Sequence, residues 1–157
     1  MLINLFLAIY GLAMCFVLFY SFAQANLLWH FFKFKDRKMP MASLADKELP
    51  KVTVQLPVFN EKYVVERLIE AISFMHYPKE NLEIQVLDDS TDETADIIKN
   101  CLKAFPEINF KYIHRENRQG FKAGALKEGL EVAEGDLIAI FDADFVPDPY
   151  FLLKTVG

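Results

Sequence analysis

Two aspartates near the end of the chain have the spacing expected of a metal-binding pair. Asp142 directly follows the apolar run 138–141, and Asp144 comes two residues later, in the stretch IAIFDADFVPDP (138–149). Such a run is typical of a buried strand, and a strand that ends in Asp-x-Asp aims two hard oxygen ligands at one point. Mg²⁺ and Mn²⁺ accept such ligands when phosphate oxygens complete the octahedron. We therefore predict that Asp142 and Asp144 hold a divalent cation, and we interpret Asp148 as a helix cap or turn residue.

A basic stretch upstream could bind an anion. Arg115, Arg118 and Lys122 lie in HRENRQGFKAGAL, residues 114–126, between a predicted strand and a predicted helix. The free N–H groups and the dipole of a helix N-terminus favour anions, and the small residues of this stretch leave room for close approach. Together with the acidic pair, this stretch predicts a site for a metal-bound diphosphate. A solvated basic turn before an amphipathic helix is the alternative interpretation.

More carboxylates follow two other predicted strands. Glu61 comes shortly after the strand 51–56, and Asp88 and Asp89 directly follow the strand 82–87. Acids brought together destabilise a fold unless a cation or ligand compensates them. In open α/β sheets, ligands bind beyond the carboxyl ends of the strands, near a switch in strand order. These acids therefore indicate a binding site at one edge of a sheet.

The elements that must position these side chains alternate regularly. Strands are predicted at 51–56, 82–87, 109–113 and 136–141, and helices after Asn60, from 90 to about 104, and at 121–133. Strands that read as continuous apolar runs between helices predict an α/β fold with a parallel sheet covered on both faces. Asn60 is expected to cap the first of these helices. The stretch STDE, residues 90–93, is expected to form a capping box for the second.

The first 32 residues contain no charged side chain. Because roughly 20 apolar residues cross a bilayer core as a helix, we predict a transmembrane helix at 1–32, either the only one or the first. A cleaved signal peptide is the alternative, with Ala23-Gln24-Ala25 as its cleavage site. However, no Lys or Arg precedes the apolar run, which exceeds the roughly 7–15 residues of a signal peptide.

Basic residues follow this apolar segment. Residues 33–38 carry four basic groups and one acid, which by the positive-inside tendency places the following domain in the cytoplasm. We interpret 33–50 as a basic juxtamembrane linker. Residues 39–157 carry 13 basic and 21 acidic groups, an excess of acid that argues against a nucleic-acid partner. Cys15 and Cys101 form no disulfide or zinc pattern.

Four motifs in register resemble the membrane-embedded family-2 glycosyltransferases, in particular the branch of cellulose synthase-like proteins and glucomannan 4-beta-mannosyltransferases. They are PVFNE (57–61), VLDDSTDET (86–94), HRENRQGFKAGAL (114–126) and IFDADFVPDPYF (140–151). The resemblance covers roughly residues 51–153. It implies the nucleotide-binding half of a GT-A (Rossmann-like) fold, a nucleotide-sugar donor of the UDP-glucose or GDP-mannose type, and Mg²⁺ or Mn²⁺. It also implies inverting transfer of a hexose to a growing β-glycan acceptor at the cytoplasmic face of a membrane.

The resemblance further implies roles for individual residues in binding the donor. The nucleotide would lie beside Pro57 and Glu61, and Asp88 or Asp89 would bind the nucleobase. The choice between uracil and guanine stays open, as does the choice between glucose and mannose.

On the phosphate side, the same resemblance assigns Lys122 to the diphosphate, and Asp142 and Asp144 to the metal and the ribose side of the donor. The cation and Lys122 would stabilise charge that develops on the leaving diphosphate.

The chain ends at Gly157, before the acidic motif that supplies the general base in this family and before its QxxRW motif. We therefore expect 51–157 to be the N-terminal half of a truncated GT-A domain that binds donor and metal but contains no catalytic base. We also expect an exposed edge of the sheet that favours association.

Three alternatives were weighed. Haloacid dehalogenase-like phosphatases use a DxD in which the first acid, here Asp142, attacks phosphate. They continue with Gly-Thr on their earliest strand, whereas Phe145-Val146-Pro147 follows here on the fourth. A receiver-like domain would need an aspartate on the strand 109–113, which has none. An inactive, membrane-tethered remnant without a ligand is the third alternative, and metal-dependent binding of a nucleoside diphosphate would exclude it.

Overall fold

The chain divides into two units. The computed structural model describes residues 1–35, in the first unit, and residues 49–156, in the second. The first unit contains one helix, α1 (Leu2–Phe34). Most of the predicted linker 33–50 lies outside the described residues.

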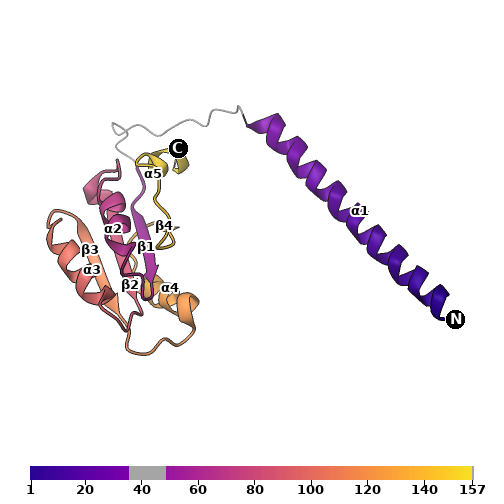
Figure 1. The fold of residues 1–157 in the computed structure, drawn as a ribbon. Coiled ribbons are helices and arrows are strands. Elements are labelled where there is room, and N and C mark those ends of the chain that lie inside the picture. The colour runs from indigo at the N-terminus through magenta and orange to yellow at the C-terminus, as the bar shows by residue number, and fades with distance from the viewer. Residues whose placement is uncertain (36–48, 157) are drawn as a thin grey trace. The chain divides into compact units, whose positions relative to one another are not determined.

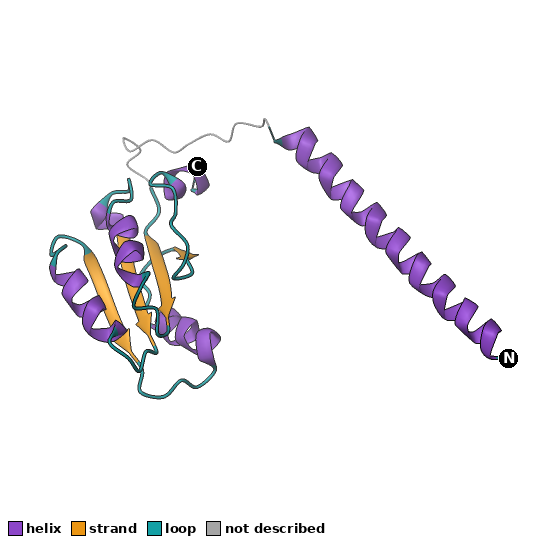
Figure 2. Ribbon diagram, viewed as in Figure 1, coloured by secondary structure: helices purple, strands orange, loops and turns teal. Residues whose placement is uncertain are grey.

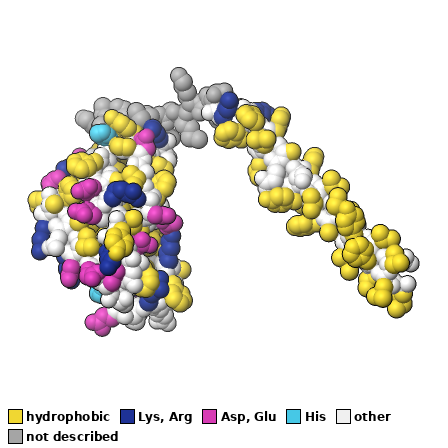
Figure 3. Space-filling view, viewed as in Figure 1, with side chains coloured by type: hydrophobic (Ala, Val, Ile, Leu, Met, Phe, Trp, Pro, Cys, Tyr) yellow, Lys and Arg dark blue, Asp and Glu magenta, His cyan; other side chains and the backbone are white. Residues whose placement is uncertain are grey.

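Helix α1 is mostly hydrophobic on the face seen in Figure 3. It has 33 residues, and the mean hydropathy of its most apolar window is 2.4. Among the described residues it alone is long and apolar enough to cross a membrane, by length and composition. A signal sequence near an N-terminus has the same properties, so the alternative interpretation remains.

The second unit, described over residues 49–156, alternates strands and helices (Figures 1 and 2). Its elements are β1 (Val52–Val58), α2 (Val65–Ser73), the 3₁₀ turn η1 (Lys79–Asn81), β2 (Leu82–Asp88), α3 (Thr94–Lys103), β3 (Asn109–His114), α4 (Phe121–Glu131), β4 (Leu137–Ile140) and α5 (Phe151–Thr155).

The four strands form one parallel sheet in the order β3-β2-β1-β4. The chain first adds β2 and β3 on one side of β1 and then returns to add β4 on the other, so the strand order switches between β1 and β4. Right-handed crossovers therefore place α2 and α3 on one face of the sheet and α4 on the other. In agreement, α2 packs against α3, and α4 packs against β1 and β2. The predicted parallel α/β fold is confirmed.

The two faces of the sheet have different chemistry. On the α2 and α3 side, the strands contribute Val54, Leu56, Ile84 and Val86, which are fully buried with Leu68, Ile69 and Ile72 of α2. These residues form an apolar core. The alternate strand residues are polar but also buried: Thr53, Gln55, Glu83 and Gln85.

Helix α4 covers this polar face closely. Gln55 Nε2 donates a hydrogen bond to Gln85 Oε1 (2.9 Å) and another to the carbonyl of Leu126 on α4 (3.4 Å). A Cβ at Gly129 would lie only 2.7 Å from Gln55 Nε2 and 2.8 Å from Gln85 Oε1. The glycine therefore lets α4 approach the sheet and fixes the depth at which the helix sits.

The two predicted caps differ from the structure. Asn60 has a left-handed backbone (φ 54°), and its Oδ1 accepts a hydrogen bond from the N–H of Thr91 (2.9 Å) instead of capping α2. Ser90 Oγ accepts from the N–H of Asn60 (2.9 Å), so the capping box does not form either. The cause is tertiary: β1 and β2 are neighbours, and the loops that follow them bind each other. Asp92 accepts from the N–H of Thr94 (3.0 Å) at the start of α3.

The prediction of a buried fourth strand is wrong for the described chain. Leu137 is 46% exposed and Ile140 is 49% exposed. Among the described residues, β4 is an edge strand that pairs with β1, and residues of α5 line a pocket with its side chains. The expectation of an exposed sheet edge is confirmed.

Candidate functional site

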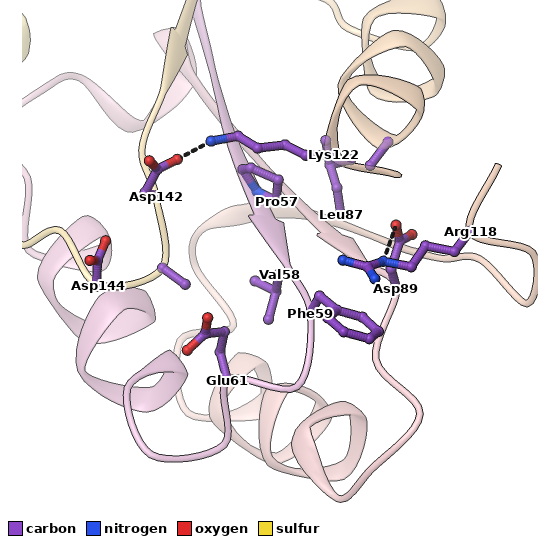
Figure 4. A pocket seen from close by; sticks show the side chains of 12 residues that line it. Pro57, Val58, Phe59, Glu61, Leu87, Asp89, Arg118, Lys122, Asp142 and Asp144 are labelled. Carbon is purple, nitrogen blue, oxygen red and sulfur yellow. Dashed lines mark hydrogen bonds and ion pairs between the residues drawn. The ribbon is translucent and has the colours of Figure 1, made fainter. Parts of the chain in front are cut away.

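A pocket of about 320 Å³ lies where β1, β2 and β4 end (Figure 4). It occupies the switch in strand order, the position at which ligands bind in open α/β sheets. Of the predicted site residues, six line it: Pro57, Glu61, Asp89, Lys122, Asp142 and Asp144. Residues from four separate segments of the sequence thus meet at one place.

Asp88 is the predicted residue that does not line this pocket. It is fully buried, and its carboxylate accepts hydrogen bonds from Tyr112 Oη (2.6 Å), His114 Nδ1 (2.9 Å) and the N–H of Ser90 (2.8 Å). Burial, followed by the hydrogen bond to Asp88, raises the pKa of Tyr112. The structure therefore places Asp88 in a bridge between β2 and β3, and Asp89 at the pocket.

Asp89 lies on the same side of the pocket as the aromatic residue Phe59. Its two carboxylate oxygens each accept a hydrogen bond from the guanidinium of Arg115, both at 2.7 Å. Arg118 Nε lies 3.9 Å from Asp89 Oδ2, and its guanidinium carbon lies 3.3 Å from the centre of the Phe59 ring (Figure 4). Phe59, Asp89 and Arg118 together form a flat, partly aromatic wall that suits a planar ring.

The acidic side of the pocket is built by the end of β4. Ala143 is buried, and the aspartates on either side of it line the pocket. Asp142 forms an ion pair with Lys122, and Glu61 faces them from the loop after β1 (Figure 4). No group of three or more His, Cys, Asp or Glu side chains that could hold a metal by itself occurs in residues 1–35 and 49–156. Two carboxylates fit a cation that takes its remaining ligands from phosphate and water.

The basic side is the start of α4. Gly120 (φ 73°) and Phe121 (φ 51°) turn the chain sharply, and the helix begins without a side-chain cap. The N–H of Phe121 donates to the carbonyl of Arg118 (3.0 Å), and the N–H groups of Lys122 and Ala123, which follow it in the first turn, can serve an anion. Lys122, in the first turn, reaches into the pocket, as the basic stretch predicted.

Two features were missed by sequence reasoning. Arg115, predicted as part of an exposed cationic cluster, is only 7% exposed and does not line the pocket. Arg118 stacks on Phe59. The register of β2 and β3 could have indicated the first feature, because Asp88 pairs with His114 and the next residues along each strand are Asp89 and Arg115.

A parallel α/β sheet with acids and a basic helix start around one pocket at its switch point is the arrangement of nucleotide-binding α/β proteins. Comparison with known families agrees: the family described as "Glycosyl transferase family 2" matches residues 53–157, and the chain belongs to this family. This confirms the family predicted from the four motifs.

Curated relatives come from plants. The chain is 48% identical over 118 residues to "Probable glucomannan 4-beta-mannosyltransferase 7" of Oryza sativa subsp. japonica, a match that covers 69% of this chain and 20% of the relative. It is 45% identical over 119 residues to "Glucomannan 4-beta-mannosyltransferase 9" of Arabidopsis thaliana, covering 72% and 22%. The chain thus spans about a fifth of the length of these relatives.

Solved structures share the fold. A mannosyltransferase from Pyrobaculum calidifontis, solved with GDP-Man and Mn²⁺, has a TM-score of 0.69 and 29% identity over 90% of this chain and 42% of the solved chain. Glucosyl-3-phosphoglycerate synthase from Mycobacterium tuberculosis, solved with Mn²⁺, UDP and phosphoglyceric acid, has a TM-score of 0.53 and 26% identity over 72% and 41%. These neighbours confirm the predicted GT-A-like fold class. Neither the family match nor these structures support the phosphatase or receiver alternatives.

Proposed function

We propose that this chain supplies the donor- and metal-binding half of an inverting glycosyltransferase that transfers a hexose from a nucleotide sugar to a growing β-glycan. The observation that carries the proposal is the pocket itself. It brings acids from the ends of β1, β2 and β4 opposite Lys122 and the uncapped start of α4. The membership of family 2 supports the same reaction class.

Within the pocket, we assign the diphosphate to the side chain of Lys122 and to the N–H groups of Lys122 and Ala123 in the first turn of α4. These donors stabilise negative charge, and such charge grows on the diphosphate as its bond to the sugar breaks. The nucleobase is assigned to the wall formed by Phe59, Asp89 and Arg118, beside Pro57. Glu61 lies on the opposite side, near the acids that follow β4.

Asp142 and Asp144 would hold Mg²⁺ or Mn²⁺. When bound, the cation supplies Lewis-acid stabilisation of the leaving diphosphate. The two carboxylates provide the oxygen ligands that this role requires, and the Mn²⁺ in two related structures supports a divalent ion. No residue of this chain is assigned as the catalytic base.

We favour mannose and guanine over glucose and uracil. The curated relatives are named glucomannan 4-beta-mannosyltransferases, and the neighbour with a TM-score of 0.69 was solved with GDP-Man. A glycan acceptor, membrane attachment through α1 and a cytoplasmic position of the pocket complete the proposal. The apolar helix and the basic residues of 33–38 support the last two points.

Isothermal titration of the 157-residue chain in nanodiscs tests the donor site. We expect GDP and GDP-mannose to bind with Mn²⁺ present, and the affinity to fall sharply when EDTA removes the cation. UDP and UDP-glucose are the matched controls for base choice, and tighter binding of these two would reverse the assignment of guanine. Absence of binding by all four nucleotides would support the ligand-free remnant.

A further inference from the structure

Arg115 is a buried charge that lies outside the pocket. It is 7% exposed and lies next to Asp89, one of the residues that line the pocket. A buried charge destabilises a fold unless its donors are satisfied. The contacts that satisfy Arg115 therefore indicate which parts of the chain it holds.

All five N–H donors of Arg115 have acceptors. Nε and Nη2 each donate to one oxygen of Asp89 (2.7 Å and 2.7 Å), and Nη2 also donates to the carbonyl of Phe121 (3.0 Å). Nη1 donates to the carbonyl of Gln119 (3.2 Å) and to Glu128 Oε1 (3.0 Å). The two carboxylates among these acceptors, Asp89 most of all and then Glu128, raise the pKa of Arg115 further above its usual value.

The acceptors belong to three segments that meet at the pocket. Asp89 follows β2, Gln119 and Phe121 form the turn into α4, and Glu128 lies on α4 itself. In this turn Phe121 has a left-handed backbone, which is unfavourable for a residue other than glycine. The two hydrogen bonds from Arg115 to carbonyls flanking Gly120 hold the chain in that conformation.

The residue that follows this turn is Lys122. The position of Lys122 in the pocket depends on where α4 begins. The start of α4 is set in turn by the carbonyls of Gln119 and Phe121, which Arg115 holds. Gly124 keeps the arrangement close: a Cβ there would lie 1.9 Å from the Gln119 carbonyl oxygen and 2.9 Å from Arg115 Nη1.

We propose that Arg115 is a positioning residue, which sets the diphosphate-binding geometry of Lys122 by fixing the turn before α4 to Asp89 without contacting the ligand itself. This inference rests on the proposed donor site. The positioning role of Arg115 requires a planar group with five donors in fixed directions, so lysine is a poor substitute.

The test measures GDP binding with Mn²⁺ in the 157-residue chain for R115K, K122M and the double variant. We expect R115K to weaken GDP about tenfold, the equivalent of one charge-assisted hydrogen bond. If Arg115 acts through Lys122, R115K has no further effect in the K122M background, whereas a general loss of stability would be additive. R67K, on the exposed face of α2, is the matched control and should bind as the wild type does.

The other possible results of this test would overturn either the inference or the proposed function. Equal binding by R115K and the wild type, or additive effects of R115K and K122M, would overturn the inference and leave the donor site intact. Absence of GDP binding by the wild type would overturn the proposed function, and the inference with it. If R115K does not fold, E128A removes one of the contacts from the solvent side, with K127A as its control. Binding by E128A should weaken by a smaller factor, and unchanged binding would contradict the proposal.

Discussion

At the scale of single residues, the charged side chains have two roles: some are exposed at the pocket, and others are buried in hydrogen bonds behind it. Asp142, Asp144 and Lys122 are exposed at the pocket, where a ligand can reach them. Asp88 is buried behind it and bonded to Tyr112 and His114. Acids at the ends of different strands therefore differ in what their removal should do.

The first prediction concerns the exposed pair. D142N and D144N each remove one charged oxygen ligand, so we expect Mn²⁺-dependent GDP binding to weaken about tenfold or more. Titration calorimetry at several Mn²⁺ concentrations measures this change. D148N is the control, because Asp148 binds Lys154 and the N–H of Tyr150 at the start of α5. Equal losses in all three variants would argue against a specific metal site.

The second prediction concerns the buried acid. Y112F removes the 2.6 Å hydrogen bond to Asp88 and leaves a buried carboxylate with one partner fewer. The free energy of unfolding should fall by about 1–2 kcal/mol, measured by urea denaturation. GDP affinity should stay unchanged, since Asp88 does not line the pocket. A large loss of affinity with little loss of stability would instead favour Asp88 as the nucleobase ligand.

At the scale of elements, helix α4 links the fold to the site. Its start carries Lys122, its last turn rests on the polar face of the sheet through Gly129, and a cluster of ion pairs lies beyond its end. In this cluster, Lys111 Nζ lies 2.6 Å from Glu134 and 2.9 Å from the buried Glu83. The depth of α4 and the position of the pocket are therefore coupled.

The third prediction tests this coupling. In G129A the added methyl group would overlap Gln55 and Gln85, so α4 must shift away from the sheet. We expect a loss of about 1–3 kcal/mol in the free energy of unfolding together with weaker GDP binding. K127A on the exposed face of the same helix should change neither quantity. An unaltered GDP affinity in a folded G129A protein would show that the depth of α4 does not control the site.

The fourth prediction is a pH dependence. Hydrogen bonds from Lys111 and Lys51 lower the pKa of Glu134 from 4.5 to about 2. Because the folded-state pKa is the lower one, the stabilisation is fully present above about pH 4.5 and is lost as the pH falls towards 2. Thermal denaturation of the wild type and E134Q should differ above pH 4.5 and converge below it. The difference should be small because Glu134 is exposed, and a constant difference over this range would contradict the assignment.

Much of this architecture follows from local sequence. Hydrophobic patterning located every strand, and the helix predicted at 121–133 corresponds to α4. The failures share one cause: Asn60, Ser90 and Arg115 form their contacts with segments about 26 to 31 residues away. Local propensity contains no information on such partners, whereas strand register does once the order of the strands is known. The exposure of β4 depends on what lies beyond the sheet edge, which a strand's own sequence does not reveal.

At the scale of the whole molecule, the sheet is covered by helices at its centre and open at the β4 edge. Helices cover both faces around β1 and β2, while β4 exposes apolar side chains and an unpaired edge. Exposed apolar edges are templates for association. The match to the relatives covers about a fifth of their length, and the family match runs to residue 157.

The fifth prediction follows from this open edge. I140K places a charge on β4 at a side chain that is 49% exposed, so we expect less self-association with little change in stability. Sedimentation velocity over a range of concentrations in one detergent measures the association, with α1 unchanged in every sample. L130K, on the equally exposed Leu130 of α4, is the control for added charge. Equal reductions by both variants would indicate a general charge effect.

The central position of β1 also affects how the protein forms during synthesis. Val52 pairs with Leu82 on one side, 30 residues later in the chain, but with Leu137 on the other, 85 residues later. Translation proceeds at roughly 5–20 residues per second, so one edge of β1 stays unpaired for about 4 to 17 s before β4 is synthesised. During that interval the strand at the centre of the finished sheet is itself an edge, and the nascent chain is most vulnerable to incorrect pairing there.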